Sequence, residues 1–102
     1  MLDDKTMRQQ IDELAGAMLS LQSVEEARSF FEDLFTVGEI QAISQRLAVA
    51  RMLRDKAKYQ EIAERTGAST ATISRVNRAL LYGAGGYQRV LMREEARQEE
   101  QP

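Results

Sequence analysis

One face of the segment from 69 to 78 carries side chains that suit contact with a nucleic acid. Hydroxyl groups and the first amides of a helix can hold phosphate, and arginine can bind phosphate or the O6/N7 edge of guanine. Short side chains at the start of such a helix would let its backbone approach the floor of a DNA groove. The DNA-contacting residues predicted on this basis are Ser69, Thr70, Ala71, Thr72, Ser74, Arg75 and Arg78, together with Lys58 from the preceding bend.

Two helices and a tight turn are needed to present that face, and the stretch 59–80, YQEIAERTGASTATISRVNRAL, predicts them. Gly67 is predicted to end the first helix, because a sharp turn there requires a positive φ that glycine adopts without a steric penalty. Ser69 is a suitable N-cap for the second helix, and the small Ala63 permits a close crossing. The spacing is typical of a helix-turn-helix DNA-binding unit, and a helical hairpin with a solvated polar face is the alternative. The residues predicted to face inward are Ile62, Ala63 and Thr66 on the first helix and the apolar stripe Ile73, Val76 and Leu80 on the second.

The remaining sequence predicts an all-α protein of about six helices. Ala, Leu, Glu, Gln and Arg dominate, with one proline and six glycines in 102 residues. Capping boxes are predicted at Ser23 with Glu26 and at Thr36 with Glu39. We expect a single domain over 1–102, with dimerisation helices in 1–35, the helix-turn-helix core in 36–81, and a C-terminal helix with a frayed tail in 87–102. The other predicted helices span 3–21, 24–35, 37–54 and 88–100.

Charge is unevenly distributed along the chain. The net charge is −2, but residues 1–35 carry 8 acidic and 3 basic side chains, whereas residues 36–78 carry 4 acidic and 8 basic ones. DNA responds to the local field, so the basic half suits DNA binding with marked salt dependence. Arg51, Arg54, Lys56 and Lys58 lie near the bend before the helix-turn-helix, and phosphate contact and a solvated surface are equally compatible with the sequence there.

Several classes of function are disfavoured by composition. The chain has no cysteine and no histidine, which excludes disulfides, the usual zinc and iron sites, and Cys or His nucleophiles. Its carboxylates do not occur in a motif with a catalytic base, with a set of metal ligands or with a phosphate-binding loop. We therefore expect that the protein is not an enzyme and has no cofactor. Apolar runs are too short to span a membrane, and the N-terminus is too polar for a signal peptide. We therefore expect a cytoplasmic protein without a membrane partner.

The run from 36 to 83, TVGEIQAISQRLAVARMLRDKAKYQEIAERTGASTATISRVNRALLYG, resembles the Trp repressor family. It looks most similar to the branch of YerC/YecD-type Trp-repressor-related bacterial proteins. GASTATISRVNRALLYG, residues 67–83, is the strongest element, and the resemblance extends over about 19–87. It implies an all-helical, intertwined homodimer that binds double-stranded operator DNA as a transcriptional regulator, most simply a repressor. The alternative is a protein-interaction module on the same fold that has lost specific DNA binding.

The resemblance also implies a possible effector pocket. Arg46, Arg75, Thr36 and Thr72 match positions that the family uses around a bound tryptophan. However, Val76 stands where the family has a pocket glycine, and Ala79 replaces a pocket serine. The valine side chain would intrude on the indole, and alanine lacks a hydroxyl for the ammonium group. Tryptophan is therefore not the expected effector, and another small molecule or none is expected.

Overall fold

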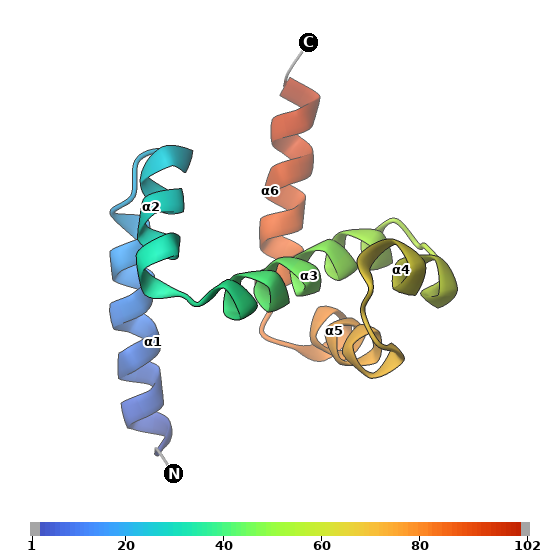
Figure 1. The fold of residues 1–102 in the computed structure, drawn as a ribbon, viewed down its shortest axis with the longest axis horizontal. Helices are drawn as coiled ribbons and strands as arrows, with labels where there is room; N and C mark the ends of the chain where they lie inside the picture. Colours follow the sequence, from blue (N-terminus) through green and yellow to red (C-terminus); the bar gives the residue numbers. More distant parts are fainter. Residues whose placement is uncertain (1–2, 101–102) are drawn as a thin grey trace. The chain divides into compact units, whose positions relative to one another are not determined.

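The structure is a computed structural model that describes residues 3–100, and within this range it contains six α-helices and no strand (Figure 1). This confirms the predicted all-α class. The chain divides into two compact units, one up to Ile40 and one from Gln41 onward. The helices are α1 (Asp4–Leu19), α2 (Val24–Leu34), α3 (Val37–Arg54), α4 (Tyr59–Thr66), α5 (Thr70–Tyr82) and α6 (Gly86–Glu100).

Side-chain caps set the starts of α1 and α2. The Asp3 carboxylate accepts the Thr6 N–H at 2.7 Å. This bond, and to a smaller extent the Thr6 side chain, lower the pKa of Asp3. The Ser23 hydroxyl accepts the Glu26 N–H at 3.1 Å, as predicted. The return bond of the predicted capping box differs, because Glu26 accepts the N–H of Gln22. The first helix also ends at Leu19, two residues earlier than predicted, and the N–H of the following Ser20 bonds back into the last turn.

The first unit does not bury an apolar core of its own. Neither α1 nor α2 contains a buried residue. Phe31 lies between Phe30 and Phe35, with ring centroids 6.2 and 5.7 Å away, yet all three rings are only half-buried. Apolar side chains of α1 are more exposed still, with 57% of Ile11 accessible. The exposed large apolar residues of α1 are Met7, Ile11, Leu14 and Leu19.

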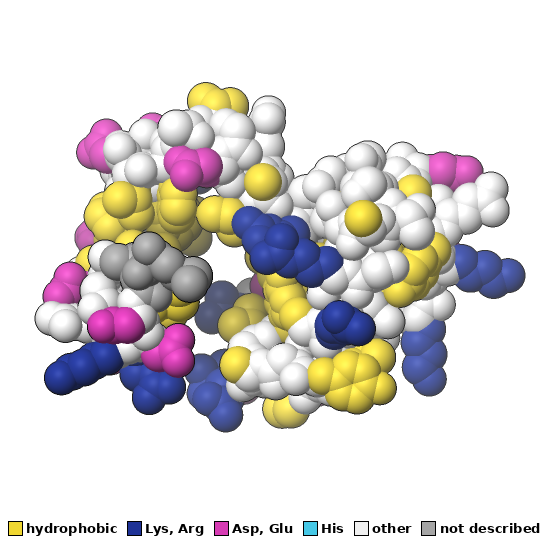
Figure 2. Space-filling view, turned by 90° about the horizontal axis from the view of Figure 1, so that it is seen from below, with side chains coloured by type: hydrophobic (Ala, Val, Ile, Leu, Met, Phe, Trp, Pro, Cys, Tyr) yellow, Lys and Arg dark blue, Asp and Glu magenta, His cyan; other side chains and the backbone are white. Residues whose placement is uncertain are grey.

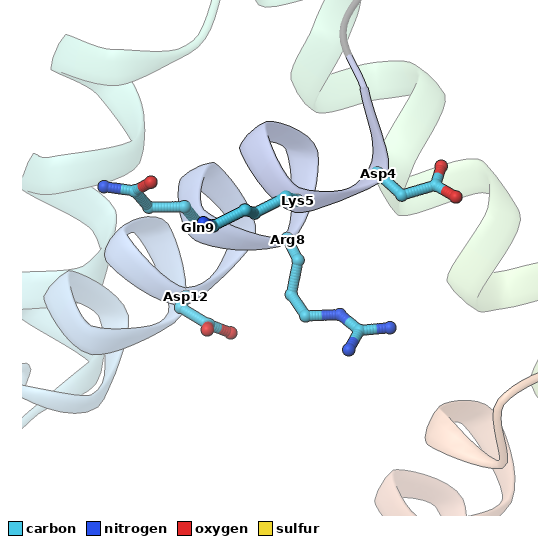
Figure 3. A pocket seen from close by; sticks show the side chains of 5 residues that line it. All are labelled: Asp4, Lys5, Arg8, Gln9 and Asp12. Atoms are coloured by element: carbon cyan, nitrogen blue, oxygen red, sulfur yellow. The ribbon is translucent and has the colours of Figure 1, made fainter.

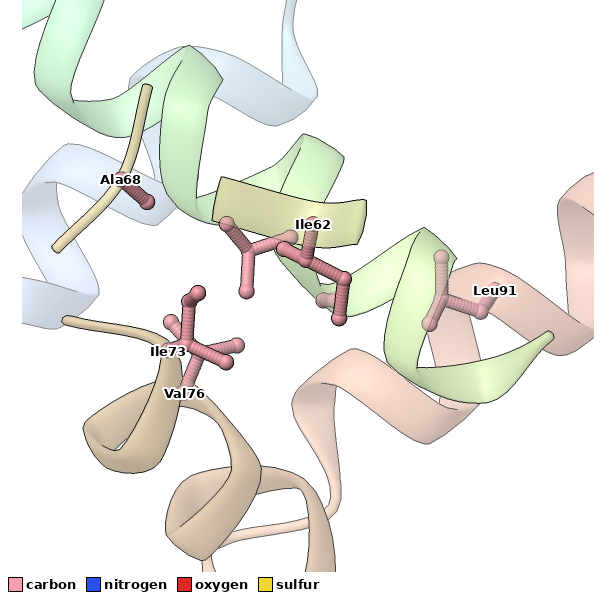
Figure 4. Close-up of a cluster of buried hydrophobic side chains, with 7 residues drawn as sticks. Ile62, Ala68, Ile73, Val76 and Leu91 are labelled. Carbon is pink, nitrogen blue, oxygen red and sulfur yellow. The ribbon is translucent and has the colours of Figure 1, made fainter. Parts of the chain in front are cut away.

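The second unit is built around a compact apolar cluster contributed by four helices and the turn (Figure 4). The predicted inward positions of the helix-turn-helix occupy its centre, since Ile62, Ile73 and Val76 are at most 1% exposed. Leu80, the last residue of the predicted stripe, packs half-buried against the same cluster. The fully buried members among the described residues are Val49, Ala50, Ile62, Ala68, Ile73, Val76 and Leu91.

The helix-turn-helix has the predicted local geometry. Gly67 follows α4 with φ 74°, and its N–H donates to the Ala63 carbonyl at 2.9 Å. The Ser69 hydroxyl accepts the Thr72 N–H at 3.1 Å and so caps α5. The turn is closed by local hydrogen bonds. Gly67 and Ser69 therefore play the roles that the sequence assigned to them.

Helix α6 is tied to α3 by ion pairs. Arg51 bonds to Glu94 with an Nη2–Oε1 distance of 2.7 Å, and Arg54 pairs with Glu95. Both arginines lie at the partly exposed surface and pair with carboxylates that the sequence did not predict, and their contact with phosphate stays a prediction. Gln88 Nε2 also donates to the Leu80 carbonyl at 2.7 Å, which joins the first turn of α6 to the end of α5. The helix begins at Gly86, two residues before the predicted start.

Candidate nucleic-acid interface

The outer face of α5 and the start of α4 line one hollow of about 590 Å³ on the second unit. Four of the predicted DNA-contacting residues lie together in it. They are spaced at i, i+3, i+4 and i+7, which is one face of a helix. The residues from the predicted set are Ala71, Ser74, Arg75 and Arg78.

The same hollow contains residues that sequence analysis did not assign. Asn77, Leu81 and Tyr82 continue the α5 face, so extending the helical spacing toward the C-terminus would have found them. Tyr59 comes from α4, and no local spacing connects it with α5. Its side chain and that of Tyr82 place aromatic rings beside the two arginines, and Tyr82 is 81% exposed.

The hollowed face is free to bind an anion. Helix α5 contains Arg75 and Arg78 and no acidic residue, and neither arginine forms an ion pair within residues 3–100. Figure 2 shows basic and apolar side chains next to each other on the visible face of the part formed by α3 to α5, whereas acidic side chains are concentrated over α1 and α2. An arginine without an acidic partner retains its full capacity for phosphate or a guanine edge.

The other predicted contact residues lie at helix starts. Ser69 and Thr72 bond to each other, with the Ser69 hydroxyl donating to Thr72 Oγ1 at 3.0 Å while it caps the helix. Thr70 is exposed at the first position of α5, where the free amides of the helix point outward. Lys58 is exposed at the N-cap of α4, next to Tyr59 of the hollow, and its side chain makes no capping bond in the described part of the chain.

The residues predicted for an effector pocket come from both compact units, and their assembly into a pocket stays a prediction. Thr36 belongs to the first unit and caps α3: its hydroxyl accepts the Glu39 N–H at 3.1 Å, and its own N–H donates to Glu39 Oε1 at 2.9 Å. The Thr36 N–H, and to a smaller extent the Thr36 side chain, lower the pKa of Glu39 by hydrogen bonding to its carboxylate. Arg46 is half-buried on α3, Arg75 is exposed in the hollow, and Thr72 is engaged with Ser69.

Val76 and Ala79 are the two positions at which the sequence departs from the tryptophan pocket. Val76 is 1% exposed and is packed in the core of the second unit, so its side chain fills space that a glycine would leave open. Ala79 is exposed on the same helix and offers no hydrogen-bonding side chain. That tryptophan is not the effector stays a prediction.

A shallow depression on α1 is lined by charges of both signs from one helix, and the labelled side chains do not converge (Figure 3). No group of three or more acidic side chains in residues 3–100 is arranged to hold a metal ion. No helix in that range is long and apolar enough to cross a membrane. The depression is lined by Asp4, Lys5, Arg8, Gln9 and Asp12.

Comparison with known proteins connects this helix-turn-helix with one family. The family model described as Trp repressor protein matches residues 9–95. The uncharacterized protein YerC of Bacillus subtilis (strain 168) is 51% identical over 90 residues, which cover 88% of this chain and 86% of that protein.

Two solved structures share the fold over nearly the whole chain. A TrpR-like protein from Eubacterium eligens ATCC 27750 has a TM-score of 0.84 at 53% identity, covering 91% of this chain and 96% of that one. A proposed Trp repressor from Staphylococcus aureus has a TM-score of 0.84 at 45% identity, covering 93% and 96%. The family match spans both compact units and the entire hollowed face. The chain belongs to the Trp repressor family.

Proposed function

We propose that this protein is a sequence-specific, DNA-binding transcriptional regulator that acts as a dimer, and that repression is its mode of action. The observation that carries the proposal is the outer face of α5, where two arginines without acidic partners lie beside short side chains in one hollow. Membership of the Trp repressor family supports the same conclusion.

Helix α5 is the proposed recognition helix. Ala71 and Ser74 are exposed and short, so the helix can approach the bases of a major groove. Arg78 and Arg75 follow on the same face and can bind phosphate or guanine. Thr70 and the free amides of the first turn would bind a phosphate of the DNA backbone, and Lys58 adds positive charge from the start of α4. Tyr59 and Tyr82 supply aromatic surface at the edges of the contact.

The dimer is supported by the exposed apolar surface of the first unit. Residues 3–40 leave large apolar side chains accessible and bury none completely, which is costly for a unit that must stay folded in water. A second copy of the chain would cover this surface. A twofold axis would then place two copies of α5 in successive major grooves about 34 Å apart, so the site would be an inverted repeat.

Selection of bound duplexes from a random DNA pool, at low and at physiological salt, tests the proposal. We expect an inverted repeat with half-sites about one helical turn apart. Arg78→Ala should weaken binding, with a loss at one base position if it reads guanine or an even loss over all sequences if it contacts phosphate. Arg93→Ala on the exposed face of α6 is the matched control and should bind as the parent does.

The alternative is a protein-interaction module that has lost specific DNA binding. The exposed apolar side chains of α1 and the acidic character of the first unit are the features that favour it, because both suit docking to another protein. Failure to bind any duplex at low salt, with no response to Arg78→Ala, would favour this alternative. Enrichment of a defined repeat would reject it.

A further inference from the structure

The amide of Gln45, on α3, reaches across to the turn of the helix-turn-helix. Its Nε2 donates to the carbonyl of Thr66 at 3.1 Å, over a separation of 21 residues. Thr66 is the last residue of α4, and a carbonyl at that position lacks an intrahelical partner. Gln45 therefore supplies the partner that the end of α4 would otherwise need from water.

The rest of the turn is held by its own short-range bonds. The Thr66 hydroxyl donates to the Ile62 carbonyl at 2.7 Å and accepts the Ala68 N–H at 3.1 Å. Gly67 takes its positive φ between them. Within the described residues, Gln45 is the one side chain from outside 59–82 that hydrogen-bonds to residues 66–69. A Cβ built on Gly67 would meet Gln45 Nε2 at 3.9 Å, so the amide lies directly over the turn.

The remaining contribution of α3 to this region is apolar. Val49 and Ala50 of α3 belong to the same buried cluster as Ile62 and Ile73. Apolar burial is strong but has no preferred direction, whereas a hydrogen bond restricts both distance and angle. The apolar cluster holds the helices together, and the Gln45 bond is the directional contact between α3 and the turn.

We propose that Gln45 is a positioning residue that fixes the turn, and with it the start of α5, relative to α3. Helix α5 begins at Thr70, four residues after the carbonyl that Gln45 holds. A small shift of the turn is carried along the helix to the face that bears Ser74 and Arg78. The consequence for DNA rests on the proposed function, but the effect on the turn itself does not.

The test compares three variants with the parent protein. Gln45→Met keeps the length of the side chain and removes the donor. Gln41→Met is the matched control, because Gln41 is an exposed glutamine one turn earlier on α3 whose side chain makes no hydrogen bond in the described range. Gln45→Lys restores a donor that can reach the Thr66 carbonyl.

Hydrogen exchange and DNA discrimination are the two measurements. In Gln45→Met we expect exchange of the Ala68 amide to accelerate about tenfold, as loss of an ordinary hydrogen bond implies, while the buried Leu91 position on α6 stays protected. The preference for the selected duplex over a scrambled one should fall by a similar factor. Gln41→Met should change neither quantity, and Gln45→Lys should recover most of both.

Unchanged exchange at Ala68 in Gln45→Met would overturn the proposal, and so would equal acceleration at Ala68 and Leu91, which would indicate general destabilisation. If Gln45→Lys recovered neither quantity, packing would replace hydrogen bonding as the cause. Exchange at Ala68 decides the matter even if the parent protein binds no DNA. In that event the proposed function fails, while exchange at Ala68 still tests the role of Gln45 in the turn.

Discussion

Arg51 of α3 and Glu94 of α6 are joined by two hydrogen bonds, with an Nε–Oε2 distance of 3.1 Å and an Nη2–Oε1 distance of 2.7 Å. This fork-shaped pairing uses both carboxylate oxygens. Hydrogen bonding to Arg51 lowers the pKa of Glu94 from its usual value of 4.5, and the same bonds raise the pKa of Arg51. Together with Leu91, which is buried in the apolar cluster, the pair holds α6 against the rest of the second unit.

The contribution of the Arg51–Glu94 pair to the free energy of unfolding should depend on pH. The folded-state pKa of Glu94 lies below its unfolded value, so the pair stabilises the protein above about pH 4.5, and this contribution is lost as the pH falls through the lowered pKa. Glu94→Gln should cost up to about 1 kcal/mol at neutral pH, because the pair is partly exposed. Urea unfolding at pH 7 and at pH 3 measures the difference, which should shrink at the acidic value.

Glu99→Gln is the control for that measurement. Glu99 is exposed on the same helix, and it makes no ion pair within the described residues. Its unfolding free energy should match that of the parent at both pH values. Equal losses in Glu94→Gln and Glu99→Gln would show that α6 charge in general, and not the Arg51 pair, is responsible.

Lys56 is predicted to be a strained position. It has φ 64° after the end of α3, a region that favours glycine. Its N–H donates to Leu53 O at 3.0 Å, and the Ala57 N–H donates to Met52 O at 3.0 Å, the pattern of a helix end that usually carries glycine. Lys56→Gly should raise the free energy of unfolding by up to about 1 kcal/mol, since relief of strain exceeds the added freedom of the unfolded chain.

Lys56→Ala separates conformation from charge. Alanine keeps the left-handed strain but removes the positive charge, so its stability should stay close to that of the parent. Chemical denaturation of both variants provides the comparison. A gain in Lys56→Ala as large as that in Lys56→Gly would attribute the effect to charge and reject the backbone explanation.

Ser69 and Ser74 should respond differently to alanine. Ser69 caps α5, so Ser69→Ala should cost about 1 kcal/mol of stability. Ser74 is exposed in the hollow and makes no capping bond, so Ser74→Ala should leave the thermal midpoint nearly unchanged and alter DNA binding. Thermal unfolding and a DNA-binding titration on each variant would show the contrast. Equal losses of stability would mean that Ser74 is also a structural residue.

Tryptophan should not switch DNA binding. Val76 is 1% exposed and fills core space, and Ala79 has no hydroxyl to offer the ligand. The dissociation constant for the selected duplex should be the same with and without tryptophan at millimolar concentration. That concentration is high enough to detect weak binding of a metabolite. Calorimetric titration of the protein with tryptophan alone checks the same point. Tighter DNA binding on addition of tryptophan would contradict the prediction. The ligand would then bind at a place other than the positions around Val76 and Ala79.

Much of the fold could be predicted because its signals are local. Periodic apolar residues predicted Ile62, Ile73 and Val76 as core, and all three are buried. Gly67 and Ser69 marked the turn, since a left-handed φ and an N-cap depend on neighbouring residues only. The helical limits were within two residues, and the largest differences lay at the end of α1 and the start of α6, where helix ends depend on nearby caps.

The candidate site was only partly visible in the sequence. The spacing of Ala71, Ser74, Arg75 and Arg78 placed them on one face, because a helix repeats every 3.6 residues. The hollow that they share needed the fold, since Tyr59 joins it from α4.

The sequence by itself determined the helices, the capped turn and the basic face of α5, because each rests on interactions between residues a few positions apart. Tertiary structure alone decided the partners of Arg51 and Arg54, which lie 43 and 41 residues from their carboxylates, and the contact of Gln45 with Thr66. A side chain chooses among distant partners by three-dimensional proximity, and no local period encodes that proximity. The same physics explains why the arginines near the bend are held by α6.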